Sequence, residues 1–374
     1  METFNNIINQ YDWNATQKSI LSKSSRDVEE ALSNPHKDME DFKSLLSPAA
    51  IPYLEQMAKL SRQLTLKRFG KTIQLYIPLY LSNVCENECL YCGYNRANAI
   101  KRITLTDEEI LKEIEIIKSF GFRHILLVTG ESRYAGVEYL NHVLQLIRSH
   151  FSLISIEVQP LEQKEYELLI SSGLNSVYLY QETYNRIHYK NYHLFGKKTD
   201  FDFRLDTYER LGRSGVHKIG LGVLLGLEDW RTDSFFTALH LKYLQKRYWK
   251  TKYSVSFPRL RPHSGNFEPN CTMTERELLQ LICAYRIFDE YVELSLSTRE
   301  SEKFRNHAFT LGITAMSAGS KTEPGGYAIH SNALKQFEPD DNRSPAEIKE
   351  LILSQGYEAV WKDWDVYMQM TDSN

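Results

Sequence analysis

Short runs of β-branched and aromatic residues alternate with amphipathic segments along most of this chain, and this alternation strongly constrains its fold. The candidate strands span 72–82, 124–131, 154–160, 176–183, 217–227, 253–260, 292–299 and 313–320. Between them, 106–121, 161–173 and 274–292 show the helical spacing of three and four. Eight repeats over about 250 residues predict an α/β fold, a (β/α)8 TIM-type barrel. An open doubly wound sheet has the same periodicity and remains the alternative.

The segments outside this alternation predict three regions. Residues 1–70 are polar with helical patterns, and the last of these ends at Gly70, as a helix C-terminus does. We therefore expect a helical N-terminal extension over 1–70, the barrel over 71–328, and a C-terminal extension over 329–374 that packs on or near the barrel and contains the motif VWKDWD.

Composition excludes several classes of partner. The net charge of −3 gives no electrostatic reason to expect nucleic acid or an anionic membrane. No apolar run is long enough to span a bilayer, and the N-terminus lacks the pattern of a signal peptide. We predict a cytoplasmic protein.

Three of the five cysteines lie within eight positions, directly after the first candidate strand. Cys85, Cys89 and Cys92 are too closely spaced for a disulfide framework, whereas Cys271 and Cys283 are expected to be buried or half-buried apolar residues. Three thiolates give one ligand fewer than a closed zinc site needs, although His124 could supply a fourth. On a four-iron cluster, three ligands leave one iron open for catalysis. The spacing therefore indicates a functional metal centre.

The motif CENECLYC resembles the C-x3-C-x-aromatic-C motif of the radical S-adenosylmethionine superfamily, with Tyr91 at the aromatic position. This resemblance implies that Cys85, Cys89 and Cys92 bind one [4Fe–4S] cluster and that the amino and carboxylate groups of S-adenosylmethionine chelate its unique iron.

The same resemblance assigns cofactor contacts at the ends of later strands. Gly130 and Glu131 match the GGE element that holds the methionyl ammonium group, with Thr129 in place of the first glycine. Glu182 and Arg204 resemble the pair that contacts the ribose and the methionyl carboxylate. The alternative for Glu182 and Arg204 is an ordinary surface ion pair.

Similarity within the superfamily extends over nearly the whole chain. Eight segments resemble the family of 2-iminoacetate synthases, the tyrosine lyases of thiamine thiazole biosynthesis. They are LSPAAIPYLEQMA, PLYLSNVCENECLYCGYN, QETYN, LGVLLGLEDWR, SFPRLRP, LSTRES, SAGSKTEPGGY and VWKDWD. A related hydrogenase-maturation family carries a second cysteine cluster near its C-terminus, but no cysteine follows Cys283 here. We therefore expect a single cluster.

This resemblance implies a reaction and partners. L-Tyrosine is cleaved at its Cα–Cβ bond to 2-iminoacetate and p-cresol, while S-adenosylmethionine becomes methionine and 5′-deoxyadenosine. The implied partners are thiazole synthase, which accepts the imine, and a flavodoxin or ferredoxin-type electron donor.

Two residues are the expected substrate contacts. Arg299 matches an arginine that holds the substrate carboxylate in related tryptophan lyases, and a guanidinium suits that role because it donates two parallel hydrogen bonds. Its alternative is an ion pair with Glu300 or Glu302. Tyr80 resembles a tyrosine near the substrate amino group, and its alternative is core packing.

Several questions stay open at this level. Ser256, Arg259 and Arg261 at the end of the sixth strand are candidates for either the cofactor or the substrate phenol. A lyase of tryptophan or another aromatic amino acid and a zinc-stabilised scaffold are the alternative functions.

Overall fold

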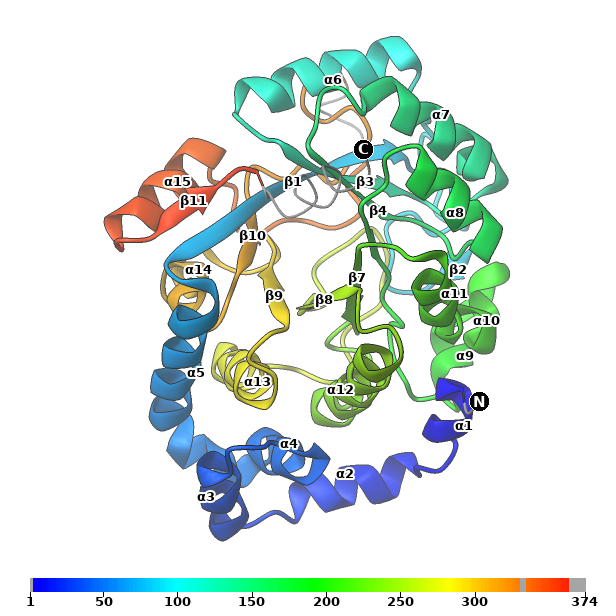
Figure 1. Cartoon of the computed structure of the whole chain (residues 1–374). Helices are drawn as coiled ribbons and strands as arrows, with labels where there is room; N and C mark the ends of the chain where they lie inside the picture. The colour runs from blue at the N-terminus through cyan, green and yellow to red at the C-terminus, as the bar shows by residue number, and fades with distance from the viewer. Residues whose placement is uncertain (1–2, 330–333, 363–374) are drawn as a thin grey trace.

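The computed structural model describes residues 3–329 and 334–362 and contains a closed barrel of parallel strands surrounded by helices (Figure 1). The eight barrel strands are β1 (Thr72–Ser82), β3 (His124–Thr129), β4 (Leu153–Glu157), β5 (Ser176–Tyr178), β7 (Lys218–Gly222), β8 (Lys252–Ser256), β9 (Glu293–Leu296) and β10 (Ala315–Ser317). Each pairs with the next in chain order, and β10 pairs with β1 to close the ring. The predicted barrel is therefore confirmed, and the open sheet is wrong.

The connecting helices follow the apolar periodicity of the sequence. They are α6 (Asp107–Ser119), α7 (Val137–Ile147), α8 (Gln163–Ser171), α9 (Tyr189–Tyr192), α10 (Phe201–Leu205), α11 (Thr207–Ser214), α12 (Trp230–Arg247), α13 (Glu275–Phe288), α14 (Glu302–Ala308) and α15 (Pro345–Ser354). Thr106 and Glu109 form a capping box at the start of α6, where two backbone N–H groups bond to their side chains. Gly121 follows this helix with φ +95°, a conformation that glycine adopts without steric cost.

Residues before the barrel form a helical layer along one side of it. This layer consists of α1 (Phe4–Ile8), α2 (Trp13–Leu21), α3 (Ser25–Ser33), α4 (Met39–Leu46), the 3-10 turn η1 (Pro48–Tyr53) and α5 (Leu54–Phe69). Figure 1 shows it running past the outer faces of α12 and α13. Phe4 stacks on His240 of α12 with ring centroids 3.7 Å apart, and Phe42 packs edge-on against Tyr285 of α13. The domain boundaries themselves stay predictions.

Two short pairings are absent from the sequence prediction. β2 (Glu88–Cys89) pairs antiparallel with β6 (His193–Phe195), and β11 (Glu358–Val360) pairs with the start of β1. The motif VWKDWD begins in β11, but its residues 363–365 lie outside the described ranges.

The hydrophobic core lies between the barrel strands and the helices around them. Every residue of β3 is buried, as expected for a strand of a parallel sheet covered on both faces. Within the described residues, no helix has the length and apolar character needed to cross a bilayer.

Candidate active site

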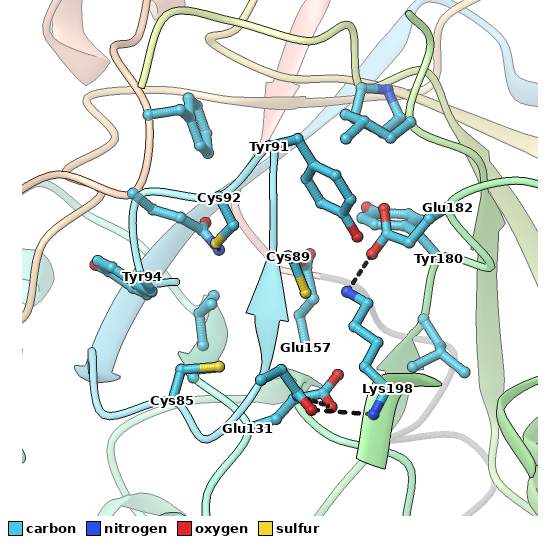
Figure 2. Close-up of a pocket in the computed structure, with 18 of the residues that line it drawn as sticks. Cys85, Cys89, Tyr91, Cys92, Tyr94, Glu131, Glu157, Tyr180, Glu182 and Lys198 are labelled. Carbon is cyan, nitrogen blue, oxygen red and sulfur yellow. Dashed lines mark hydrogen bonds and ion pairs between the residues drawn. The ribbon is translucent and has the colours of Figure 1, made fainter. Parts of the chain in front are cut away.

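A cavity opens where the carboxyl ends of the strands meet, and the loop after β1 forms part of its wall. Figure 2 shows the sulfur atoms of Cys85, Cys89 and Cys92 around this cavity. The pairing of β2 with β6 holds the loop, because Cys89 lies opposite His193. Within residues 3–329 and 334–362, no three His, Cys, Asp or Glu side chains surround one point closely enough for a single metal ion. The thiols share a cavity without converging on one point.

The three thiols are in an environment that disfavours the thiolate. Burial raises the pKa of Cys85 to about 11 and also raises the pKa values of Cys89 and Cys92. A bound cation would reverse this effect, since metal-ligating thiols are deprotonated by the metal's charge. The donor set therefore fits a metal group whose charge balances three thiolates.

Gly130 and Glu131 follow β3 and lie directly beside the cysteine loop. A Cβ atom on Gly130 would lie 2.4 Å from the carbonyl oxygen of Val84, so this position requires glycine. The Glu131 carboxylate accepts hydrogen bonds from Asn87 Nδ2 at 2.7 Å and Arg204 Nη1 at 2.9 Å. Burial opposes its ionisation, but Arg204 and Lys198 hold its pKa below the usual value. Glu131 is therefore an anion within the cavity wall.

Glu182 forms the other half of this charged wall. Its carboxylate lies 2.6 Å from Lys198 Nζ, as Figure 2 shows by a dashed line. It also lies 3.5 Å from Arg204 Nη2. Glu182 is also the one non-glycine residue with positive φ among the described residues, at +70°. Such conformations cost about 1–3 kcal/mol and concentrate at functional sites. The backbone strain turns the carboxylate into the cavity beyond the end of β5.

Arg204 lies in α10, and its position is fixed by the barrel backbone. Its Nε donates to the carbonyl oxygen of Tyr180 at 2.8 Å while its two terminal nitrogens contact Glu131 and Glu182. Arg204 is 4% exposed, so the surface-pair alternative does not describe it. The predicted cofactor contacts Gly130, Glu131, Glu182 and Arg204 are therefore brought together.

Tyr91 lies beside the cysteines in the wall of the same cavity. Its hydroxyl is 2.7 Å from His193 Nε2, and the Lys198 ammonium lies 5.7 Å from the centre of its ring. The aromatic position of the cysteine motif thus joins the loop to β6.

A second cavity adjoins the first deeper in the barrel and contains both predicted substrate contacts. Tyr80 and Arg299 line it, and Arg299 also lines the first cavity. The Arg299 guanidinium lies 3.4 Å from the ring centre of Phe337 and donates to the carbonyl oxygen of Arg259. Burial lowers its pKa.

The acidic neighbours of Arg299 have other partners. Glu300 pairs with Arg259, and Glu302 lies 3.7 Å from Arg343. In the described part of the chain, Arg299 thus forms no ion pair with either glutamate. Its guanidinium faces the cavity, whose wall also contains Glu157.

The structure separates the three candidates at the end of β8. Ser256 lines the second cavity and Arg261 lines the first. Arg259 is instead held by Glu300 and by the carbonyl oxygen of Met273, as expected for a structural ion pair.

Four charged or amide side chains of the site were missed by the sequence prediction: Asn87, Glu157, Lys198 and Gln336. Asn87 lies between the cysteines, and Glu157 is a charged residue in an otherwise buried strand, so both had a local signal. Lys198 and Gln336 lie far from the cysteines in sequence and have no such signal. Burial raises the pKa of Glu157 to about 7, against a partial lowering by Arg299.

Comparisons with known proteins identify the family. The model of the Radical SAM superfamily matches residues 79–238, and that of the Biotin and Thiamin Synthesis associated domain matches 256–358. The chain is 49% identical to 2-iminoacetate synthase of Escherichia coli (strain K12) and 48% identical to that of Salmonella typhimurium (strain LT2), over 98% of each chain.

A solved structure agrees with this relationship. The crystal structure of HydG, a maturase of the [FeFe]-hydrogenase, superposes with a TM-score of 0.88 at 29% identity, over 96% of this chain and 84% of HydG. Its similarity supports the barrel described above. The full-length match and the three-cysteine loop at the barrel mouth together show that this chain belongs to the 2-iminoacetate synthase family, lyases of the radical S-adenosylmethionine superfamily that use a [4Fe–4S] cluster and S-adenosylmethionine.

Proposed function

We propose that this chain cleaves the Cα–Cβ bond of L-tyrosine to give 2-iminoacetate and p-cresol, for thiamine thiazole biosynthesis. The observation that carries the proposal is the 49% identity over 98% of the chain to a 2-iminoacetate synthase. Membership of this family is not compatible with the alternative of a zinc-stabilised scaffold.

Cys85, Cys89 and Cys92 are the proposed cluster ligands. Their common cavity and the cost of ionising buried thiols without a metal support this assignment. When bound, the cluster and S-adenosylmethionine supply a 5′-deoxyadenosyl radical that removes a hydrogen atom from the substrate.

The charged wall of the cavity binds the methionyl end of the cofactor. Glu131, which Asn87 holds in place, accepts hydrogen bonds from the ammonium group of the cofactor. Arg204 donates hydrogen bonds to the methionyl carboxylate. Glu182 accepts hydrogen bonds from the ribose hydroxyls, and the ammonium group of Lys198 balances the negative charge of Glu182. These groups are fixed before the ligand arrives, which reduces the ordering cost of binding.

The second cavity orients the substrate. Arg299 forms a bidentate ion pair with the tyrosine carboxylate, and Phe337 covers the guanidinium from one side. Tyr80 lies beside the amino group, the site of hydrogen abstraction. Orientation is decisive for a radical reaction, since a misplacement of about 1 Å can lower the rate roughly 100-fold.

The product and the reductant imply two partners. Thiazole synthase takes the imine, which hydrolyses in water, and a flavodoxin or ferredoxin-type protein supplies the electron.

Product analysis tests this function. Anaerobically reconstituted protein with a reductant, S-adenosylmethionine and L-tyrosine should give p-cresol, 5′-deoxyadenosine and glyoxylate from the hydrolysed imine, measured by mass spectrometry. Cys92→Ala protein is the control and should give none. Cleavage of tryptophan in place of tyrosine would contradict the proposal and support the tryptophan alternative.

A further inference from the structure

The side chain of Gln336 connects the substrate cavity to one of the cysteines. Its Oε1 accepts a hydrogen bond from the Tyr80 hydroxyl at 2.8 Å, and its Nε2 lies 3.9 Å from the sulfur of Cys92. Gln336 lies 244 residues from Cys92 in sequence. The contact exists because the segment before α15 folds back over the barrel mouth.

The backbone fixes this position. The backbone N–H of Gly93 donates to the backbone carbonyl oxygen of Gln336 at 3.2 Å. The backbone N–H of Gln336 donates to the backbone carbonyl oxygen of Thr322 at 2.9 Å. A Cβ atom on residue 93 would lie 2.7 Å from that carbonyl oxygen, so Gly93 is required for the close approach. The segment is therefore tied directly to the cysteine loop.

The chemistry of the partners determines the orientation of the amide. A thiolate has no hydrogen to donate, so it pairs with the NH2 end of the glutamine. The carbonyl end then faces Tyr80, whose hydroxyl must donate. Only this arrangement satisfies Tyr80, Gln336 and Cys92 together.

We propose that Gln336 is a positioning residue that donates an N–H···S hydrogen bond to the cluster ligand Cys92. Through Tyr80, Gln336 links the reduction potential of the cluster to the state of the substrate cavity. The inference rests on the proposed ligation of the cluster by Cys92. Hydrogen bonds to the sulfur atoms of a cluster tune its potential, because they stabilise the more negative reduced state. A substrate group that accepts the hydrogen bond of the Tyr80 hydroxyl removes this donor from Gln336 Oε1. The hydrogen bond from Gln336 Nε2 to the Cys92 sulfur then changes as well.

Potentiometric titration followed by electron paramagnetic resonance tests the hydrogen bond without turnover. Gln336→Leu should shift the cluster potential to a more negative value, with an about tenfold smaller reduction equilibrium constant, equivalent to about 59 mV for one electron. Gln355→Leu, at the exposed end of α15, is the matched control and should leave the potential unchanged. A Gln336→Leu protein with wild-type iron content and wild-type potential would overturn the proposal.

The link to the substrate cavity has its own measurement. Adding L-tyrosine should shift the potential of the wild-type cluster, and this shift should be lost in both Tyr80→Phe and Gln336→Leu. Equal shifts in all three proteins would overturn the link. Tyr80→Phe keeps the glutamine contact, so it tests the link even where Gln336→Leu fails to hold iron. A wild-type cluster with these shifts but without p-cresol formation would contradict the proposed reaction and not this inference.

Discussion

The proposed cofactor side and the proposed substrate side of the barrel mouth differ in how their charged side chains are paired. On the proposed cofactor side, Glu131 pairs with the buried Arg204 and Glu182 pairs with the half-buried Lys198 before any ligand binds. On the substrate side, neutral hydroxyl groups line the wall, and Arg299 is a cation that pairs with neither adjacent glutamate in the described residues. The hydroxyl-bearing residues include Tyr76, Tyr80, Ser256, Ser295, Ser297 and Ser317, and Glu157 also lines this wall.

The difference matches the ligands that we propose for each side. The methionyl group carries both an ammonium and a carboxylate, so a wall of paired opposite charges matches it. An arginine that forms no ion pair with either adjacent glutamate in the described residues, set among hydroxyls and Glu157, matches one carboxylate and a largely neutral remainder. Removing one partner from the buried pairs should therefore affect folding, whereas changing Arg299 should affect mainly substrate binding.

The largest expected effect is the loss of a cluster ligand, which disables both sides at once. Cys89→Ala should bind less iron and form no p-cresol, because cofactor cleavage precedes substrate cleavage. Cys271→Ala is the matched control, since Cys271 lies outside both cavities. Iron analysis and product formation are the measurements, and an active Cys89→Ala enzyme would contradict the ligand assignment.

The next effect breaks the charged wall. Arg204→Leu leaves two buried carboxylates without their shared partner and should lower the free energy of unfolding by about 3–5 kcal/mol. Arg213→Leu removes a half-exposed arginine 3.5 Å from Glu209 and should lower it by less than about 1 kcal/mol.

Urea unfolding measures both variants, and calorimetry measures cofactor binding, which Arg204→Leu should abolish. If Arg204→Leu and Arg213→Leu lowered the free energy of unfolding equally, the ion pairs of the charged wall would contribute no more to stability than a surface ion pair. Arg204→Lys keeps the charge and tests the wall even where the leucine variant does not fold.

Arg299 sharpens the comparison from the substrate side. Arg299→Gln should raise the KM for tyrosine about 10- to 100-fold, because a charge-assisted hydrogen bond contributes about 1.5–3 kcal/mol. Binding of S-adenosylmethionine should stay within about twofold of wild type. A variant with unchanged KM but weaker cofactor binding would reverse the assignment of the two cavities.

The smallest effect concerns Glu157, which lines both cavities. Its pKa of about 7, raised by burial from 4.5, means that the folded protein holds this proton more tightly than the unfolded chain. The resulting stabilisation is complete below pH 4.5 and is lost as the pH rises to about 7. In the half-buried cavity this amounts to about 1–2 kcal/mol after solvent screening.

Glu157→Gln should remove this dependence. Without bound cofactor, its free energy of unfolding should fall less between pH 5 and pH 8 than that of the wild type, as measured by urea unfolding. Glu138→Gln, an exposed change on α7, should behave like the wild type. Parallel pH profiles for all three proteins would show that Glu157 titrates normally.

Most of the barrel could be predicted because its signals are local. Each strand is a short apolar run, and Thr106 and Glu109 mark a helix start within four residues. The strand predicted at 176–183 was too long, since β5 ends at Tyr178. Beyond it the chain bends into the strained turn at Glu182, which apolar periodicity does not encode. β2, β6 and β11 were missed because these short strands are mostly exposed or half-buried and so lack the apolar run that marks the equally short β5 and β10.

The sequence by itself determined the alternation of strands and helices, the close spacing of three cysteines after the first strand and the side chains expected at the strand ends, because spacing along the chain sets which side chains follow a strand. Only the tertiary structure decided that Lys198 neutralises Glu182 and that Gln336 joins Tyr80 to Cys92. These contacts depend on distances of a few ångströms between segments far apart in the chain. Such distances result from the packing of the whole barrel, and no local pattern of residues records them.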